Sequence, residues 1–229
     1  MPSDDFMERA DDEREMTAIA DDIDDLDDDR DLDDHRADEE DADTVTFASL
    51  GLPEEILAAV TDMGFRVPTP IQAAAIPPLL ELRDVVGIAQ TGTGKTAAFG
   101  LPLLAIVDAD ERDVQALVLA PTRELAMQSA QAIEDFAART ARLDVVPVYG
   151  GSPYGPQIGA LKRGAQVVVG TPGRVIDLIE KGALDLSNVR MLVLDEADEV
   201  LRLGFAEAVE TIASGAPEER LTALFSATT

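Results

Sequence analysis

The chain of 229 residues contains no cysteine and no tryptophan, and its one histidine is His35. Without cysteine there is no disulfide framework, no thiolate nucleophile and no cysteine-bound metal. A single histidine inside an acidic stretch also argues against a histidine-based metal centre or catalytic base.

Long apolar runs are missing as well: none approaches 18 residues, and no basic segment precedes an apolar one at the N-terminus. These absences argue against a membrane-spanning helix and a secretory signal peptide. We therefore expect a soluble cytoplasmic protein without a membrane partner.

Positive charge is scarce, with three lysines and fifteen arginines against 46 acidic residues and a net charge of −28. The imbalance is uneven, because residues 1–43 hold 22 acidic and only four basic side chains. Such a stretch cannot bury enough apolar surface to fold, so 1–43 is predicted to be a disordered acidic arm. Residues 44–229 suit one domain with a substantial core. Charge alone argues against a nucleic-acid partner.

What the sequence does contain is a phosphate-loop pattern at 89–96, Ala-Gln-Thr-Gly-Thr-Gly-Lys-Thr, between an apolar strand pattern and a helix start. Gly92 and Gly94 allow the backbone to curl its N–H groups around an anion, and the helix N-terminus adds a favourable dipole. Lys95 can reach the β- and γ-phosphates, and the Thr96 hydroxyl can bind Mg²⁺. The expected contacts are Gln90, Thr91, Gly92, Thr93, Gly94, Lys95 and Thr96.

Two alternatives remain open for this stretch, a structural glycine turn and a dinucleotide fingerprint. Ala89 stands where the phosphate-loop pattern usually begins with glycine. A dinucleotide site expects an acidic residue at the end of the next strand, whereas Asp113 precedes that strand and Ala-Pro-Thr follows it. The nucleoside-triphosphate interpretation is therefore favoured.

Apolar runs alternate with helical stripes along the rest of the chain. Strands are predicted at 85–88, 115–120, 144–149, 166–169, 190–194 and 221–225, and helices at 122–138, 172–180 and 197–203. Pro53 is expected to open an earlier helix, and Thr69 to cap another that begins at Pro70. The alternation predicts an α/β fold with a parallel sheet covered by helices on both faces, with ligands at the carboxyl ends of the strands. Those ends carry polar or glycine-rich stretches at 90–96, 121–126, 150–151, 171–174, 195–198 and 226–228, here called the strand-end rim.

The ordered set of these stretches resembles the first RecA-like domain of DEAD-box RNA helicases, over residues 47–228. The matching motifs are Phe47 with 64–72, 89–96, 121–126, Gly150-Gly151, 171–174, Asp-Glu-Ala-Asp at 195–198, and 226–228. Among bacterial members the chain looks most similar to the cold-shock type.

The resemblance implies ATP and Mg²⁺ as cofactors. Thr96 and Asp195 would hold the cation, Lys95 the phosphates, and Glu196 would orient and deprotonate the attacking water. A pair of acids that merely caps a solvated helix start is the simpler alternative for 195–196. Gln72, which by itself reads as a solvated polar residue, would select adenine, with Phe47 stacking on the base. Arg66 and Thr69 belong to the same nucleotide-binding element.

The resemblance also implies that the rim grips single-stranded RNA by its backbone. The residues concerned are Pro121, Thr122, Arg123, Gly150, Gly151, Thr171, Pro172, Gly173 and Arg174. Asp198, Ser226 and Thr228 would couple the nucleotide to the RNA, although ordinary helix or turn capping is an alternative for each. A few local donors suffice for backbone contacts, so a negatively charged domain can still bind RNA.

A second RecA-like domain is expected in such proteins, and the sequence stops at Thr229 without it, so we expect a piece of a longer protein. The leading hypothesis is the ATP-binding half of an ATP-dependent RNA helicase. An RNA clamp that hydrolyses little ATP is disfavoured because Lys95 and Glu196 are both in place. A DNA helicase or another RecA-like ATPase is a third possibility, against which the Gln72 element and the Asp-Glu-Ala-Asp motif argue.

Overall fold

A computed structural model describes residues 17–20, 45–138 and 143–227 of the chain. Among these, seven parallel strands form one sheet in the order β1-β2-β7-β6-β3-β5-β4. The strands are β1 (Thr17–Ala20), β2 (Val85–Ile88), β3 (Ala116–Leu119), β4 (Val145–Val148), β5 (Val167–Gly170), β6 (Met191–Leu194) and β7 (Leu221–Ser226). The predicted α/β fold with a parallel sheet is confirmed, and the six expected strands occur within one residue of the expected bounds at each end.

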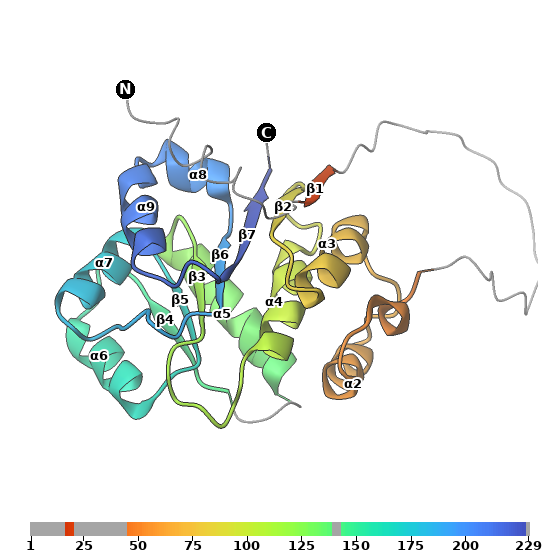
Figure 1. Cartoon of the computed structure of the whole chain (residues 1–229), viewed down its shortest axis with the longest axis horizontal. Helices are drawn as coiled ribbons and strands as arrows, with labels where there is room; N and C mark the ends of the chain where they lie inside the picture. Colours follow the sequence, from red (N-terminus) through yellow and green to blue (C-terminus); the bar gives the residue numbers. More distant parts are fainter. Residues whose placement is uncertain (1–16, 21–44, 139–142, 228–229) are drawn as a thin grey trace, which may run out of the picture.

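Helices cover both faces of this sheet. The first group comprises the 3₁₀ helix η2 (Phe47–Leu50), α2 (Glu54–Asp62), α3 (Pro70–Leu80), α4 (Lys95–Ile106) and α5 (Arg123–Ala137). The second comprises α6 (Tyr154–Arg163), α7 (Pro172–Glu180), α8 (Ala197–Arg202) and α9 (Ala206–Ser214). In Figure 1, α2, α3 and α4 lie to the right of the central strands β6 and β7, while α6, α7 and α9 lie to the left of them.

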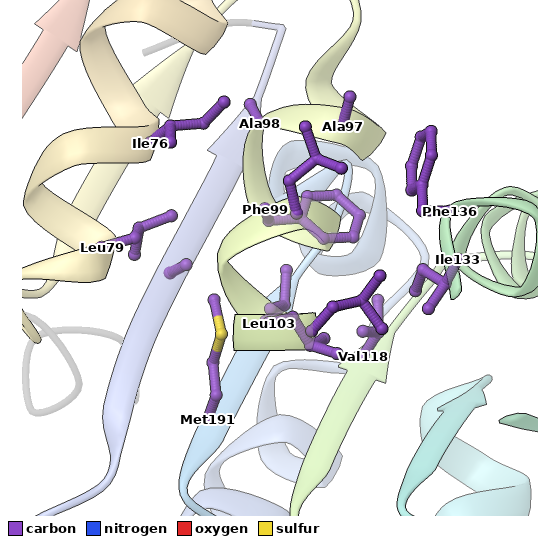
Figure 2. Packing of buried hydrophobic residues seen from close by; sticks show 14 of the residues in the cluster. Ile76, Leu79, Ala97, Ala98, Phe99, Leu103, Val118, Ile133, Phe136 and Met191 are labelled. Atoms are coloured by element: carbon purple, nitrogen blue, oxygen red, sulfur yellow. The ribbon is translucent and has the colours of Figure 1, made fainter. Parts of the chain in front are cut away.

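The period-2 alternation of strand side chains divides the core between the two faces. In β3, Ala116 and Val118 belong to the cluster under the first helix group, whereas Leu117 and Leu119 belong to the cluster under the second. Figure 2 shows the first cluster, in which Phe99 of α4 lies between helices α3 and α5. Because every β3 side chain is buried, the strand reads as a continuous apolar run.

One strand was not expected. Thr17–Ala20 lies inside the predicted disordered arm, yet β1 pairs in parallel with β2, with Ala20 opposite Ile88. For these four residues the prediction is corrected, and the rest of 1–43 lies outside the described residues. No helix in the described part of the chain is long and apolar enough to span a bilayer.

Candidate active site

The phosphate-loop pattern forms the turn between β2 and α4, as predicted. Gly92 and Gly94 have φ angles of 88° and 89°, in the left-handed region that side-chain-bearing residues avoid. The Ala89 N–H donates to the Ser226 carbonyl (2.9 Å), which ties the start of the loop to the end of β7. Lys95 is the first residue of α4, so the loop leads straight into a helix N-terminus. This is the geometry that an anion-binding loop requires.

Gln72 supports the phosphate loop from the first turn of α3. Its side chain is 4% exposed, so the expectation of a solvated residue is wrong. Its Oε1 accepts from the Thr69 backbone N–H (3.0 Å), and its Nε2 donates to the Gly94 carbonyl (3.1 Å). A Cβ on Gly94 would lie 2.3 Å from that Nε2, so the two elements touch directly. Thr69 is the N-cap residue of α3, and Arg66 is exposed.

Lys95 and Glu196 form an ion pair in which Nζ and Oε1 are 2.9 Å apart. Their side chains are only 6% and 13% exposed, so the pair is shielded from water. The Thr91 hydroxyl also donates to Glu196 Oε1 (3.4 Å). The lysine expected to bind phosphate and the carboxylate expected to activate water therefore meet across 101 residues of sequence.

Asp195 follows β6 and is 5% exposed. Burial, followed by the charge of Glu196, raises the pKa of its carboxyl group to about 6, although Lys95 and a hydrogen bond from Ser129 act in the opposite direction. The Ser129 hydroxyl of α5 donates to Asp195 Oδ2 (3.3 Å). Ser129 lies within the helix predicted at 122–138, and the sequence alone gave no signal of this contact.

Glu196 has a backbone φ of 51°, one of two positive values among the described non-glycine residues. A left-handed conformation costs a residue with a side chain about 1–3 kcal/mol and is often found at functional sites. Here it marks the junction between β6 and α8, where the chain turns at Glu196. The simpler expectation of two solvated acids capping a helix is wrong, because both carboxylates are largely buried.

The donor set suits a hard cation that also binds phosphate. Thr96 is half-buried beside Lys95, and Asp195 supplies a buried carboxylate. Within the described residues, no group of three or more His, Cys, Asp or Glu side chains could hold a metal alone. Mg²⁺ commonly takes one or two protein oxygens and completes its shell with phosphate oxygens and water, so the residues present fit Mg²⁺ bound together with a nucleotide.

Phe47 has a different environment from the one expected. Its ring is 3% exposed, belongs to the core, and lies 6.3 Å from the ring of Phe65 between centroids. A base could stack on Phe47 only if this packing changed on nucleotide binding, and the stacking role of Phe47 stays a prediction. Phe65, which sequence reasoning did not single out, is 41% exposed.

The rim residues expected to bind RNA fall into exposed and buried sets. Arg123 is exposed at the start of α5, with its guanidinium carbon 4.6 Å from the centroid of the Tyr149 ring. Gly150, Gly151 and Gly173 are exposed too. Thr122 and Thr171 are the half-buried N-cap residues of α5 and α7, and Pro121, Pro172 and Arg174 are buried. Arg174 is 6% exposed and makes its own internal bonds, which the expectation of a simple surface contact did not include.

The expected coupling residues flank the same site. Asp198 is half-buried in the first turn of α8, and Ser226 ends β7 next to the phosphate loop. Thr228 lies outside the described residues, so the structure does not test its role.

Together these features define a RecA-like phosphate-loop domain whose strand-end rim carries a buried Lys-Glu-Asp centre. The family model described as "DEAD/DEAH box helicase" matches residues 69–229, and the chain belongs to that family.

Curated relatives carry the name ATP-dependent RNA helicase DeaD. The protein from Haemophilus influenzae is 58% identical over 81% of this chain and 30% of its own length. The Escherichia coli K12 protein is 57% identical over 80% of this chain and 29% of its own length. This chain therefore spans less than a third of these relatives. A solved DEAD box protein from Methanococcus jannaschii superposes with a TM-score of 0.77 at 44% identity, over 80% of this chain and 50% of that chain.

Proposed function

We propose that this chain is the ATP-binding half of an ATP-dependent RNA helicase of the cytoplasm, which remodels RNA duplexes when joined to a second RecA-like domain. The observation that carries the proposal is the shielded contact between Lys95 and Glu196 beside the buried carboxylate of Asp195. Burying charged side chains costs free energy, and such clusters are found mainly at functional sites. A purely structural turn would not require two acids and a lysine to be buried behind a glycine loop.

The proposed chemistry begins from the Lys95–Glu196 pair. On nucleotide binding, Lys95 exchanges its bond to Glu196 for bonds to phosphate oxygens, which are charge-assisted as well. Glu196 is then released to orient the attacking water and accept its proton. Thr96 and Asp195 would hold Mg²⁺, which neutralises developing phosphate charge when bound. Gln72 holds Gly94 in place, and we assign it the additional role of reading the adenine edge.

RNA binding is assigned to the strand-end rim despite the acidic composition. Arg123 is exposed next to the open glycine turn at 150–151, and the N-termini of α5 and α7 lie at the same edge of the sheet. Backbone N–H groups and helix N-termini are common partners of phosphate in nucleic-acid complexes. The rim therefore offers local donors that do not depend on the charge of the whole domain.

Nucleotide binding should depend on Lys95 and prefer adenine through Gln72. Replacing Lys95 by alanine removes one charge-assisted partner of the phosphates, a loss of roughly 1.5–3 kcal/mol in ATP and GTP binding alike. Gln72→Ala should weaken ATP more than GTP, because only adenine uses the amide. Titration of both nucleotides against the unmodified chain and both variants, with Glu134→Ala on the exposed face of α5 as a control, measures this. Equal affinity of the unmodified chain for ATP and GTP would contradict the adenine role.

ATP hydrolysis should need more than this chain. Arginine fingers in related ATPases contribute about 10³–10⁵ in rate, and both arginines of the rim are assigned to the RNA side. We expect the 229-residue chain to hydrolyse ATP barely, and a version continued through the second RecA-like domain to be stimulated by RNA but not by DNA. Steady-state ATPase with each nucleic acid, with Glu196→Gln as the inactive control, tests the proposal. Equal stimulation by DNA would favour a DNA helicase, and equal turnover by both lengths would show that one domain suffices.

A further inference from the structure

Two side chains bracket the glycine turn at the end of β4. Gln157 of α6 donates from Nε2 to the Tyr149 carbonyl (3.2 Å), immediately before Gly150. Arg174 of α7 donates from one terminal nitrogen to the Ser152 carbonyl (2.9 Å), immediately after Gly151. The other terminal nitrogen of Arg174 donates to Gln157 Oε1 (3.0 Å), so one continuous relay holds both ends of the turn.

Both terminal nitrogens of the Arg174 guanidinium are hydrogen-bonded inside the protein, whereas its Nε is buried without a hydrogen-bond partner among the described residues. The Arg174 side chain is 6% exposed, its central carbon lies 4.1 Å from the centroid of the Tyr154 ring, and its Nε is 4.0 Å from Asp177 Oδ2. The Tyr154 hydroxyl also donates to Asp177 Oδ2 (2.8 Å), which closes the arrangement between α6 and α7. A phosphate could reach this guanidinium only after these contacts had broken.

The turn itself is open. Gly150 and Gly151 are exposed, and no atom would lie within 4 Å of a Cβ built on either residue. Gly151 has a φ of +73°, and none of the hydrogen bonds among the described residues engages the N–H of either glycine. Exposed N–H groups in a glycine turn are suited to the close approach of a phosphate.

We propose that Arg174 and Gln157 are positioning residues, which fix the turn at 150–151 as a backbone cradle for an RNA phosphate, and that the Arg174 side chain does not itself contact RNA. The inference rests on the proposed function and refines it, because it separates the residue that touches RNA, Arg123, from those that hold the cradle. An uncharged residue, Gln157, then matters to RNA binding as much as a charged one.

The hydrogen bonds that join Gln157, Arg174 and the two carbonyls explain why both side chains should affect RNA binding. Removing either side chain leaves the other with a buried polar group unsatisfied and frees one carbonyl of the turn. Lysine cannot replace Arg174, because a single ammonium cannot bridge Gln157 and Ser152 while lying flat on the Tyr154 ring. A lysine could, by contrast, serve as a direct phosphate contact. Arg174→Lys therefore distinguishes the two roles.

The test measures the affinity of a fluorescently labelled single-stranded RNA for the whole chain from about 50 to about 300 mM KCl, by anisotropy. Gln157→Met and Arg174→Lys should each weaken binding about 5- to 10-fold, with the salt dependence and the affinity for ATP unchanged. Arg123→Ala should instead flatten the plot of log affinity against log salt by about 0.7, as expected when one phosphate contact is lost.

Unchanged RNA affinity in Gln157→Met, or full retention of affinity in Arg174→Lys, would overturn the positioning role. A variant that does not unfold cooperatively on heating is misfolded and is excluded from the comparison. The RNA affinity of the other variant then tests the positioning role. Failure of the proposed function has a different signature: the unmodified chain would not bind RNA at all, or Arg123→Ala would bind as the unmodified chain does.

Discussion

At the scale of single residues, the candidate site contains charged side chains that are shielded from the solvent that would otherwise stabilise them. Lys95 neutralises Glu196 at 2.9 Å, but Asp195 beside them is 5% exposed, and no cationic side chain of the described residues forms an ion pair with it. Its main partner in the described structure is the Ser129 hydroxyl at 3.3 Å, a long and therefore weak hydrogen bond. The Asp195 carboxylate is thus prepared for a cation at the cost of the stability of the free protein.

The metal-free protein should therefore lose stability as Asp195 ionises. Its pKa is raised to about 6 from an ordinary value of 3.8, so the folded state binds the proton more tightly than the unfolded state. Stability from this group is fully present below pH ~4 and is lost as the pH rises towards 6, by about 3 kcal/mol in total. In EDTA, Asp195→Asn should match the unmodified chain near pH 4 and be more stable at pH 7, as measured by urea unfolding.

Asp185 provides a control of opposite sign. The backbone N–H of Ser187 donates to its Oδ1 (2.9 Å) and holds the pKa of this carboxyl below its ordinary value. Asp185→Asn should therefore be less stable than the unmodified chain at pH 7, with the difference fading as the pH falls through the pKa of Asp185. A constant difference between Asp195→Asn and the unmodified chain across this pH range would contradict the assigned burial effect.

The residues of the candidate nucleotide site could be proposed from the sequence, but their contacts with one another could not. A glycine loop with lysine, and two acids after an apolar strand, indicate phosphate and cation chemistry by residue type alone. The contact of Lys95 with Glu196 spans 101 residues and that of Ser129 with Asp195 spans 66, and neither leaves a local pattern. Burial was the property most often missed, as at Gln72, Phe47 and Arg174, because polar and aromatic residues read as surface residues when their neighbours are unknown.

At the scale of elements, the spacing and the polarity of the side chains were sufficient to predict the strands that lie inside the sheet. Strands buried on both faces, such as β3 and β5, are continuous apolar runs and were located within a residue. β1 was missed because Thr17–Ala20 is short and lies within an acidic segment whose composition predicts disorder. Only the pairing with β2 gives it a structure, and pairing is not a local signal.

The junction of α3 and the phosphate loop should be sensitive to one added methyl group. Gly94→Ala would place its Cβ 2.3 Å from Gln72 Nε2 at a φ of +89°. Gly92→Ala is a matched control, because its φ is +88° and nothing lies within 4 Å. We expect Gly92→Ala to lose about 1–2 kcal/mol from backbone strain alone, and Gly94→Ala to lose more.

Urea unfolding of the two variants measures the difference. Adding Gln72→Ala to Gly94→Ala should reduce the loss, because the clashing amide is then gone. Equal losses for Gly92→Ala and Gly94→Ala would show that Gln72 yields without cost, and that α3 does not hold the loop rigidly.

At the scale of the whole molecule, the direction of β1 determines at which edge of the sheet the acidic segments before and after it are attached. Because β1 is parallel to β2, the chain before Thr17 joins at the amino edge, opposite Val85, whereas Asp21 follows Ala20 at the carboxyl edge, opposite Ile88. The carboxyl edge carries the phosphate loop and the strand-end rim. Residues 4–15 hold seven acidic and two basic side chains, and residues 21–29 hold seven acidic and no basic ones, so segments of net charge −5 and −7 precede and follow β1 in the sequence.

The acidic residues after β1 should therefore weaken RNA binding more than those before it. The turn at 150–151 follows β4, six strand spacings or roughly 29 Å from β1, so the carboxylates of 21–44 would act on bound RNA by repulsion at low salt and not by occupying that turn. Neutralising the seven aspartates of 21–29 to asparagine should raise RNA affinity severalfold at about 50 mM salt. The effect should fade near 0.5 M, where the screening length is only about 4 Å. Neutralising the seven acids of 4–15 changes the net charge equally and serves as the control. Equal gains from both variants would mean that only the total charge matters and that the position of β1 has no role in RNA binding, while no gain from either would mean that the arm does not weaken RNA binding at all.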